Sequence, residues 1–241
     1  MKIKTIIFIL ALPYFVSAQT NSSIDFITGF EFSYRDLIVE GDGDILNTII
    51  EVRKKETVKS NWRIGFNYNR KITNKFHLKS GLRLASVGYK GGKITGLVWG
   101  SEIDPAMGGT GMPDPSLPHE VQFVYNYWFI EVPIIGRYEF EGNKIRPFIE
   151  AGISPSIYIS SRTTQITDIG RESSFGRQKA SSFTNLHWVA NISFGINYTL
   201  NEKMQFFGQP VYRYHLTKLV DAPIKEYLYN FGLEIGLRKR F

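Results

Sequence analysis

The chain has 241 residues, of which 15% are aromatic and none is cysteine, and its formal net charge is +7. Without cysteine, we expect no disulfide, no thiolate metal site and no lipid-anchored N-terminal cysteine. The composition is too polar for a bundle of membrane-spanning helices, but it suits a sheet that is apolar on one side only.

Residues 1–18 are typical of a secretory signal peptide. Lys2 and Lys4 give it a basic start, and residues 6–16 are apolar. This run is shorter than the roughly 20 residues of a membrane-spanning helix, so an N-terminal anchor is the less favoured alternative. We expect export and a mature domain of residues 19–241. Removing the two lysines from the 29 basic residues leaves 27 against 22 acidic ones, a surplus that favours contact with anionic lipid and lipopolysaccharide over nucleic acid.

Eight segments alternate between apolar and polar residues with a period of two, the pattern of β-strands with one apolar face. In the last segment, Phe241, Leu237 and Leu233 lie on one face, and Arg238 and Glu234 lie on the other. A water-soluble core would bury this charged stripe at a high cost, whereas a membrane barrel places the apolar face in lipid. The sequence therefore predicts an eight-stranded antiparallel up-and-down transmembrane β-barrel, with strands at about 24–36, 60–72, 76–89, 121–141, 146–160, 185–200, 204–218 and 227–241.

The connections between these strands alternate in length. Polar turns at 73–75, 142–145 and 201–203 are short, and the other connections are longer. Outer-membrane barrels have short periplasmic turns and longer extracellular loops. We therefore expect the turns and both chain ends in the periplasm, and extracellular loops at 37–59, 90–120, 161–184 and 219–226.

The fourth segment is long, and its apolar residues change phase near Tyr127 and Trp128. This change predicts a β-bulge at that point. Pro133, Pro155 and Pro210 also lie inside expected strands. Because proline cannot donate a ladder hydrogen bond, these three positions predict bulges or bends.

Charged residues of both signs fall on the inward faces of the expected strands. An eight-stranded barrel leaves an interior just wide enough for side chains to fill. Glu131 and Arg137 are six residues apart on one face, too far to pair directly, so each needs a partner on another strand. The available partners are Arg213, Arg238, Glu150 and Glu234. The favoured interpretation is an ion-pair network that plugs the lumen, and the alternative is a narrow, anion-preferring pore. The expected network comprises Glu31, Arg63, Arg83, Glu131, Arg137, Glu150, Arg213, Glu234 and Arg238, and Arg35, Lys79, Glu139 and His215 share its faces.

The histidines are the main candidates for catalysis; they are His77, His119, His187 and His215. His187 lies near Ser181 and Ser182, and a Ser/His pair at the barrel rim could hydrolyse an acyl ester. No carboxylate occurs at a spacing that would orient a histidine. We therefore expect no enzyme, no catalytic residue and no cofactor. Four scattered histidines without cysteine also give no metal site.

The segment 108–118 is rich in glycine and proline. Such a composition cannot form a helix or a regular strand. One interpretation is a surface loop without a specific role. The other is a contact surface for a partner or a ligand, because exposed loops on a rigid scaffold commonly carry that function.

The central hairpin carries a resemblance to a known family. Residues 129–140 read Phe-Ile-Glu-Val-Pro-Ile-Ile-Gly-Arg-Tyr-Glu-Phe, and residues 144–154 contain Arg-Pro-Phe followed by a glycine. These two strands resemble the PorT-like outer-membrane β-barrel family. The resemblance implies an OmpA-like small barrel, inserted by the outer-membrane assembly machinery, with Phe241 in the assembly signal. Lys239 departs from that signal, which usually has an apolar residue there.

Taken together, the sequence predicts a protein of the outer membrane of a diderm bacterium, exported and cleaved after residue 18. We expect a structural or interaction scaffold that displays extracellular loops, through which it could bind a protein partner. The first alternative is a narrow porin for small anionic solutes. The second is a lipid-modifying outer-membrane enzyme.

Overall fold

The computed structural model describes residues 22–39, 49–51, 53, 55–104, 109, 110, 112–177 and 183–241. The predicted signal peptide and the candidate residues Ser181 and Ser182 lie outside these ranges. Among the described residues, no helix is both long enough and apolar enough to cross a bilayer.

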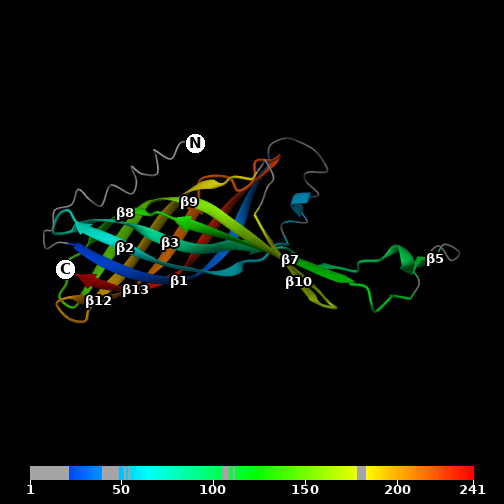
Figure 1. Ribbon diagram of the computed structural model, residues 1–241, viewed down its shortest axis with the longest axis horizontal. Coiled ribbons are helices and arrows are strands. Elements are labelled where there is room, and N and C mark those ends of the chain that lie inside the picture. Colours follow the sequence, from blue (N-terminus) through cyan, green and yellow to red (C-terminus); the bar gives the residue numbers. More distant parts are fainter. Residues whose placement is uncertain are drawn as a thin grey trace.

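Eight antiparallel strand paths form a closed barrel (Figure 1). Each path pairs with the next along the chain, and the last strand pairs with the first from Ser23↔Arg240 to Val39↔Ile224, which closes the ring. The predicted fold is therefore confirmed. The paths are β1 (Ser22–Val39), β2 (Lys59–Lys71), β3 (Phe76–Lys90), β7 (Glu120–Glu131) continued by β8 (Ile134–Glu139), β9 (Ile145–Thr167), β11 (Leu186–Thr199), β12 (Met204–His215) and β13 (Ile224–Arg240).

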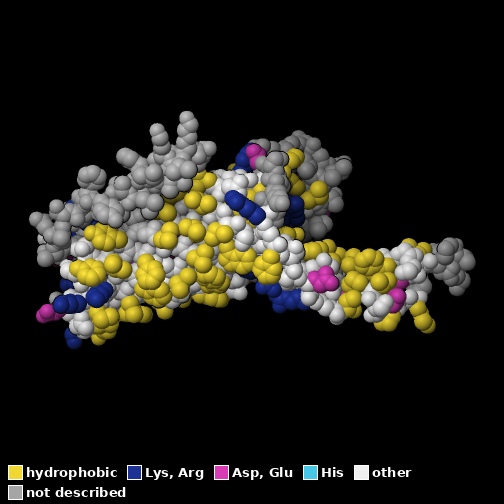
Figure 2. Space-filling model, viewed as in Figure 1, with side chains coloured by type: hydrophobic (Ala, Val, Ile, Leu, Met, Phe, Trp, Pro, Cys, Tyr) yellow, Lys and Arg dark blue, Asp and Glu magenta, His cyan; other side chains and the backbone are white. Residues whose placement is uncertain are grey.

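The outer wall of the barrel is apolar and its interior is charged. On the wall, Phe66 is 59% exposed and Leu233 is 63% exposed, whereas Glu131 and Arg137 are fully buried inside. Figure 2 shows the apolar side chains spread over the wall. Leaving such rows in water would forfeit roughly 1.5–3 kcal/mol for each large side chain, so this surface fits the hydrocarbon of a membrane.

Part of the sheet extends past one end of the barrel as an arm. The arm consists of the described residues of 91–123 and of residues 162–176, and it projects beyond the other strands in Figure 1. Five short elements build it with the ends of β7 and β9: β4 (Ile94–Thr95), the 3-10 helix η2 (Gly100–Glu102), β5 (Ile103–Asp104), β6 (Gly109–Thr110) and β10 (Arg171–Gly176).

Two sequence expectations for the arm are wrong. The connection expected at 161–184 is partly strand, because β9 continues to Thr167 and β10 pairs back on it from Arg171↔Ile166 to Gly176↔Ser161. Within 108–118, where no regular strand was expected, β6 forms a two-residue ladder with β5. Backbone pairing therefore extends farther from the barrel than the alternation of side chains indicates.

The short turns lie at the opposite end from the arm, together with both ends of the described chain. The backbone N–H of Phe241 donates to the carbonyl of Ser22 at 3.0 Å. By the rule that outer-membrane barrels keep short turns in the periplasm, we expect the arm on the extracellular side.

The predicted bulge is present, but β9 carries the extra residue. Trp128 lies opposite Ser160 and Phe129 lies opposite Tyr158, so Ile159 faces no residue of β7. The inward face of β7 does not change at the bulge. The change of phase near Trp128 therefore reflects a change in what fills the lumen, from aromatic to charged side chains.

The prolines act differently from one another. Pro133 lies in the break between β7 and β8, as expected for a residue that cannot donate to the ladder. At Pro155 the pairing of β9 with β11 keeps one register on both sides. On β12, Gln209 and Pro210 have no partner in the β11–β12 ladder, although Val211 and Gly208 on either side are paired in one register. Of the expected bulges or bends at Pro155 and Pro210, a bulge that shifts the register is therefore wrong.

Candidate functional site: the barrel lumen and the arm

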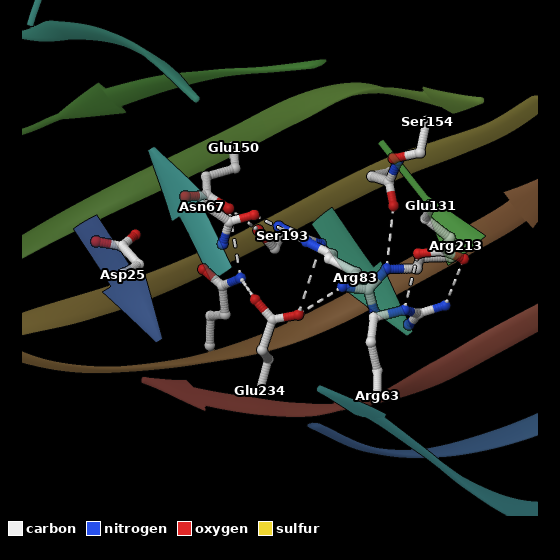
Figure 3. Close-up of polar contacts among 12 residues, drawn as sticks. Asp25, Arg63, Asn67, Arg83, Glu131, Glu150, Ser154, Ser193, Arg213 and Glu234 are labelled. Atoms are coloured by element: carbon white, nitrogen blue, oxygen red, sulfur yellow. Dashed lines mark hydrogen bonds and ion pairs between the residues drawn. The ribbon is translucent and has the colours of Figure 1, made fainter. Parts of the chain in front are cut away.

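The centre of the lumen holds a chain of ion pairs that runs from β7 to β13 (Figure 3). Arg63 of β2 donates to Glu131 of β7 through Nε at 3.0 Å and Nη2 at 3.1 Å. Glu31 of β1 accepts from both Arg63 and Arg213 of β12. Arg213 also donates to Glu234 at 2.6 Å. Since β7 and β13 lie on opposite sides of the ring of strands, this chain of pairs crosses the middle of the barrel.

A second set of pairs lies nearer to the periplasmic turns. Lys79 of β3 lies 2.6 Å from Glu150 of β9, and Arg137 Nε lies 2.7 Å from the same carboxylate. At the end of the barrel, Arg238 binds Asp25 through two hydrogen bonds of 2.7 and 3.0 Å. Two-point contacts of this kind are the strongest ion pairs in proteins.

The buried charges of the lumen balance. Below the outer rim, the described part of the chain places six buried acids and six buried bases inside the barrel. The surplus positive charge of the whole chain therefore does not reside in the lumen. The acids are Asp25, Glu31, Glu131, Glu139, Glu150 and Glu234, and the bases are Arg63, Lys79, Arg83, Arg137, Arg213 and Arg238.

Neutral amides occupy the remaining positions of the network. Asn67 accepts from Arg83 Nε, and Asn191 accepts from Arg213 Nε, both at 3.0 Å. Gln209 donates to Glu234 at 2.8 Å. These amides satisfy charged groups without adding charge, which is what a dry ionic lumen requires.

Aromatic and aliphatic side chains close the outer end of the lumen. They come from β3, β7, β9 and β13, and since β13 is a neighbour of none of the other three, the cluster crosses the barrel. Its rings pack edge to face or tilted, with centroid separations of 5.9 Å for Phe129 and Tyr158 and 4.6 Å for Tyr158 and Phe183. We call this cluster the aromatic layer; it comprises Ala85, Val87, Tyr89, Tyr127, Phe129, Tyr158, Phe183, Leu219 and Leu228.

A smaller apolar cluster lies toward the periplasmic end. It contains Ile27, Phe148 and Phe207. The guanidinium of Arg137 stacks 3.6 Å from the centre of the Phe148 ring. A Cβ added at Gly195 would come within 2.6 Å of that ring, so glycine is required there for Phe148 to fit.

Ion pairs also cover the aromatic layer on its outer side. Arg35 binds Glu56 and lies 2.7 Å from Glu226, and Arg53 lies 3.1 Å from the same Glu226. The Arg35 guanidinium stacks 3.8 Å from the centre of the Tyr89 ring. Two of these partners, Glu56 and Glu226, come from segments expected to be loops.

The structure brings together all nine lumen residues named from the sequence, and each is at most 3% exposed. Arg137 pairs with Glu150, one of the expected partners. Glu131 instead pairs with Arg63, which belongs to the expected network but was not among the partners expected for Glu131. The terminal Phe241 is 59% exposed at the periplasmic end.

Sequence reasoning missed two parts of the lumen. Asp25 is fully buried and lies on the same inward face of β1 as Glu31. The apolar Ile27 lies between them on that face, so the face does not read as a continuous polar stripe. The aromatic layer was missed because inward residues such as Tyr127 and Phe129 resemble lipid-facing ones. Every second residue of a strand lies on the same face, so counting back from Glu131 would have placed Tyr127 and Phe129 inside the barrel.

Two of the histidines, His77 and His119, lie near a carboxylate, and the other two are buried inside the barrel. His187 and His215 are buried beside Phe129, with their ring centres 5.5 Å apart. Neither ring nitrogen of His215 has a hydrogen-bond partner among the described residues. His77 lies 4.0 Å from Glu139 near the periplasmic end. Within the described ranges, no group of three or more potential ligands could hold a metal ion.

The arm is fixed near its tip by one buried carboxylate. Glu102 accepts hydrogen bonds from the backbone N–H groups of Trp99 at 2.9 Å and Asp114 at 2.6 Å, and it contacts His119 Nε2 at 2.7 Å. The two backbone donors hold the pKa of Glu102 below its ordinary value. Around this clamp, apolar side chains face solvent: Val98 is 51%, Trp99 40%, Ile103 53% and Met112 93% exposed.

Several solved barrels are similar to this chain. Neisserial surface protein A is 13% identical, with 94% of this chain and 100% of that one covered and a TM-score of 0.44. Ail of Yersinia pestis, solved with the heparin analogue sucrose octasulfate, is 10% identical over 90% and 99%, with a TM-score of 0.37. The N-terminal barrel of Pseudomonas aeruginosa OprF is 13% identical over 90% and 99%, with a TM-score of 0.32.

No curated protein matches the sequence. A family model does match, over residues 12–221, and it describes the outer membrane protein beta-barrel domain. This range covers most of the chain and the greater part of the barrel. The chain therefore belongs to the outer membrane protein beta-barrel domain family, and it is a protein of the outer membrane.

Proposed function

We propose that this protein is a non-conducting scaffold of the outer membrane that presents its arm to partners outside the cell. One observation carries the proposal: the lumen is filled along its length. The aromatic layer crosses its outer end, and a balanced ion-pair network crosses its centre.

The energetics of this filling support closure rather than transport. A passing ion would have to separate pairs such as Arg63 and Glu131, and removing one partner of a buried pair costs about 3–5 kcal/mol. It would also have to lose its water at the aromatic layer. Because six acids balance six bases, the lumen offers no net positive field to attract anions.

The arm supports the interaction half of the proposal. It extends the paired backbone of β7, β9 and β10 beyond the barrel, and the Glu102 clamp orders its distal loop. Exposed loops on a rigid scaffold are where binding residues concentrate. Apolar side chains such as Met112 at a solvent-facing tip are typical of contact surfaces.

We propose no catalysis. Nε2 of the candidate base His187 contacts the carbonyl oxygen of Thr184 at 2.8 Å, and the neighbouring His215 has no hydrogen-bond partner among the described residues, whereas a hydrolase needs a base in contact with its nucleophile and an orienting group. Release of labelled acyl chains from lipopolysaccharide by the purified barrel would contradict this.

Liposome swelling tests the closed lumen. Proteoliposomes with the folded barrel should take up small sugars and amino acids no faster than protein-free liposomes, while a general porin in parallel vesicles gives rapid swelling. Uptake that rises with the amount of barrel, and prefers anions, would support the narrow porin instead.

Photocrosslinking on intact cells tests the arm. A crosslinking amino acid at Met112 should yield a discrete adduct that the same substitution at Asp221, in the exposed connection between β12 and β13, does not. The adduct should disappear when the Glu102 clamp is removed. Equal labelling at both positions, or none at Met112, would argue against the arm as a contact surface.

A further inference from the structure

The lipid-facing wall has a groove across β9, β11, β12 and β13. Its volume is about 550 Å³, and its lining is mostly apolar. Outside the groove, large apolar side chains such as Phe66 and Leu82, both 59% exposed, cover much of the wall. The lining residues are Phe140, Pro147, Phe148, Ile149, Phe194, Gly195, Ile196, Gly208, Gln209, Pro210, Leu233, Glu234 and Ile235.

Gly208 creates the deepest part of this groove. Its neighbours Phe207 and Gln209 are buried in the lumen, so position 208 faces outward. A Cβ there would meet only Ile235 Cγ2, at 3.9 Å, so the backbone does not need glycine for packing. The side chains of Ile196 on β11 and Ile235 on β13, both paired with Gly208, form the two walls.

The groove lies in the periplasmic half of the membrane. Gly208 is four residues from Met204, where β12 leaves its periplasmic turn. At about 3.4 Å per residue, this places it at most roughly 14 Å along the strand from that turn. The hydrocarbon core is about 30 Å thick, so the groove faces the acyl chains of the periplasmic leaflet.

Two lysines lie in line with the groove at the membrane surface. Lys239 follows Ile235 and Leu237 on the outward face of β13 and pairs with Met204. The carbonyl of Lys203 accepts the backbone N–H of Arg240 at 2.8 Å, which places the Lys203 turn beside it. No ion pair joins either lysine to a carboxylate in the described part of the chain.

An apolar groove with two lysines beyond its periplasmic end fits an amphiphilic molecule that has an apolar chain and an anionic headgroup. A lysine on a lipid-facing row extends its ammonium toward the headgroups while its stem stays apolar. Anionic headgroups attract such cations. We propose that the groove binds one acyl chain of an anionic phospholipid of the periplasmic leaflet, whose phosphate contacts Lys239 and Lys203. The inference does not depend on the proposed function.

Native mass spectrometry tests this site. The mature barrel in mild detergent is incubated with equal amounts of phosphatidylglycerol and phosphatidylcholine of identical chains. The wild type should retain one phospholipid, mainly the glycerol species. Gly208→Leu should lower retention at least fivefold by filling the groove, and Lys239→Gln should abolish the headgroup preference without abolishing binding.

Two variants away from the groove control for general effects. Ser80→Leu adds bulk on the outward face of β3, which lies opposite β12 in the ring of strands, and Arg70→Gln removes an exposed cation of β2, two strands from β13, so both should behave as wild type. If Gly208→Leu does not fold, Gly208→Ala replaces it, since the added methyl makes only an ordinary contact. Equal retention by the filled variant and Ser80→Leu, an unchanged headgroup preference in Lys239→Gln, or a dimer without lipid in the spectrum would overturn the proposal.

Discussion

Glu131 shows at the scale of one residue why the lumen resists change. It is fully buried and binds Arg63 by two hydrogen bonds. Glu131→Gln would leave Arg63 with only Glu31 as a charged partner. We expect a loss of about 3–5 kcal/mol in the free energy of unfolding, measured by urea titration in detergent micelles.

An exposed pair supplies the control for this substitution. Glu141, whose side chain is 83% exposed, lies 2.7 Å from Lys75 in a periplasmic turn. Surface pairs contribute about 0–1 kcal/mol, so Glu141→Gln should leave the unfolding midpoint almost unchanged. Similar midpoints for the two variants would mean that water screens Glu131, as in an open pore.

At the scale of elements, the Glu102 clamp makes the order of the arm depend on pH. The backbone donors of Trp99 and Asp114 bind the carboxylate form, so the pKa of Glu102 is lower in the folded arm than in an unfolded chain. The clamp is therefore intact above the ordinary Glu pKa of about 4.3, and it is lost as the pH falls through the lower folded value.

Amide hydrogen exchange on the arm measures this effect. Peptides covering residues 97–104 and 112–120 should exchange slowly above the ordinary Glu pKa of about 4.3, and faster as the pH falls below it through the lower folded value, after correction for intrinsic rates. Glu102→Gln should give fast exchange already at neutral pH, while barrel peptides stay protected. Slow exchange in that variant would show that other contacts order the loop.

The closing strand β13 carries the second prediction at this scale. Phe241 is exposed beyond the last ladder pair; its backbone N–H donates to the carbonyl of Ser22, and its ring lies 5.8 Å from Nζ of the exposed Lys239. Its side chain therefore adds little to the folded barrel, so it is available for recognition by the assembly machinery. Deleting Phe241 should reduce heat-modifiable barrel in outer membranes several-fold and leave signal-peptide cleavage unchanged. Normal insertion of the shortened chain would remove Phe241 from the assembly signal.

At the scale of the whole molecule, the wall of the barrel could be predicted from the sequence. In segments such as 227–241, large apolar residues alternate with charged residues or glycine. A closed barrel places the apolar residues in lipid and the charged residues inside. The number of strands and their order follow from the turns. Partners inside the lumen could not be predicted, because the pairing of Glu131 with Arg63 depends on barrel stagger rather than on any local pattern.

The arm and the aromatic layer could not be predicted from the alternation of apolar and polar residues. β10 has six exposed residues and no apolar face, so its pairing with β9 leaves no period-two signal. Tyr127 and Phe129 do alternate, but an apolar residue inside the lumen and one facing lipid have the same sequence pattern. Their even spacing from the charged Glu131 along β7 is what places Tyr127 and Phe129 inside the lumen.

The orientation of the molecule is testable because the chain contains no cysteine. Single cysteines at Asn74, Asn143 and Glu202 should be protected from an impermeant maleimide on whole cells, since these turns face the periplasm. Cysteines at Gly109 and Ser173, on the arm, should react. Strong surface labelling at position 202 would invert the topology.

The central claim is that the lumen is closed, and current across a planar bilayer tests it most directly. The folded wild-type barrel should give no single-channel steps at moderate voltage, and Glu131→Gln should be less stable but equally silent. Stable, ion-selective steps in the wild type, altered by Glu131→Gln without loss of stability, would contradict the closed lumen and identify the protein as a narrow porin.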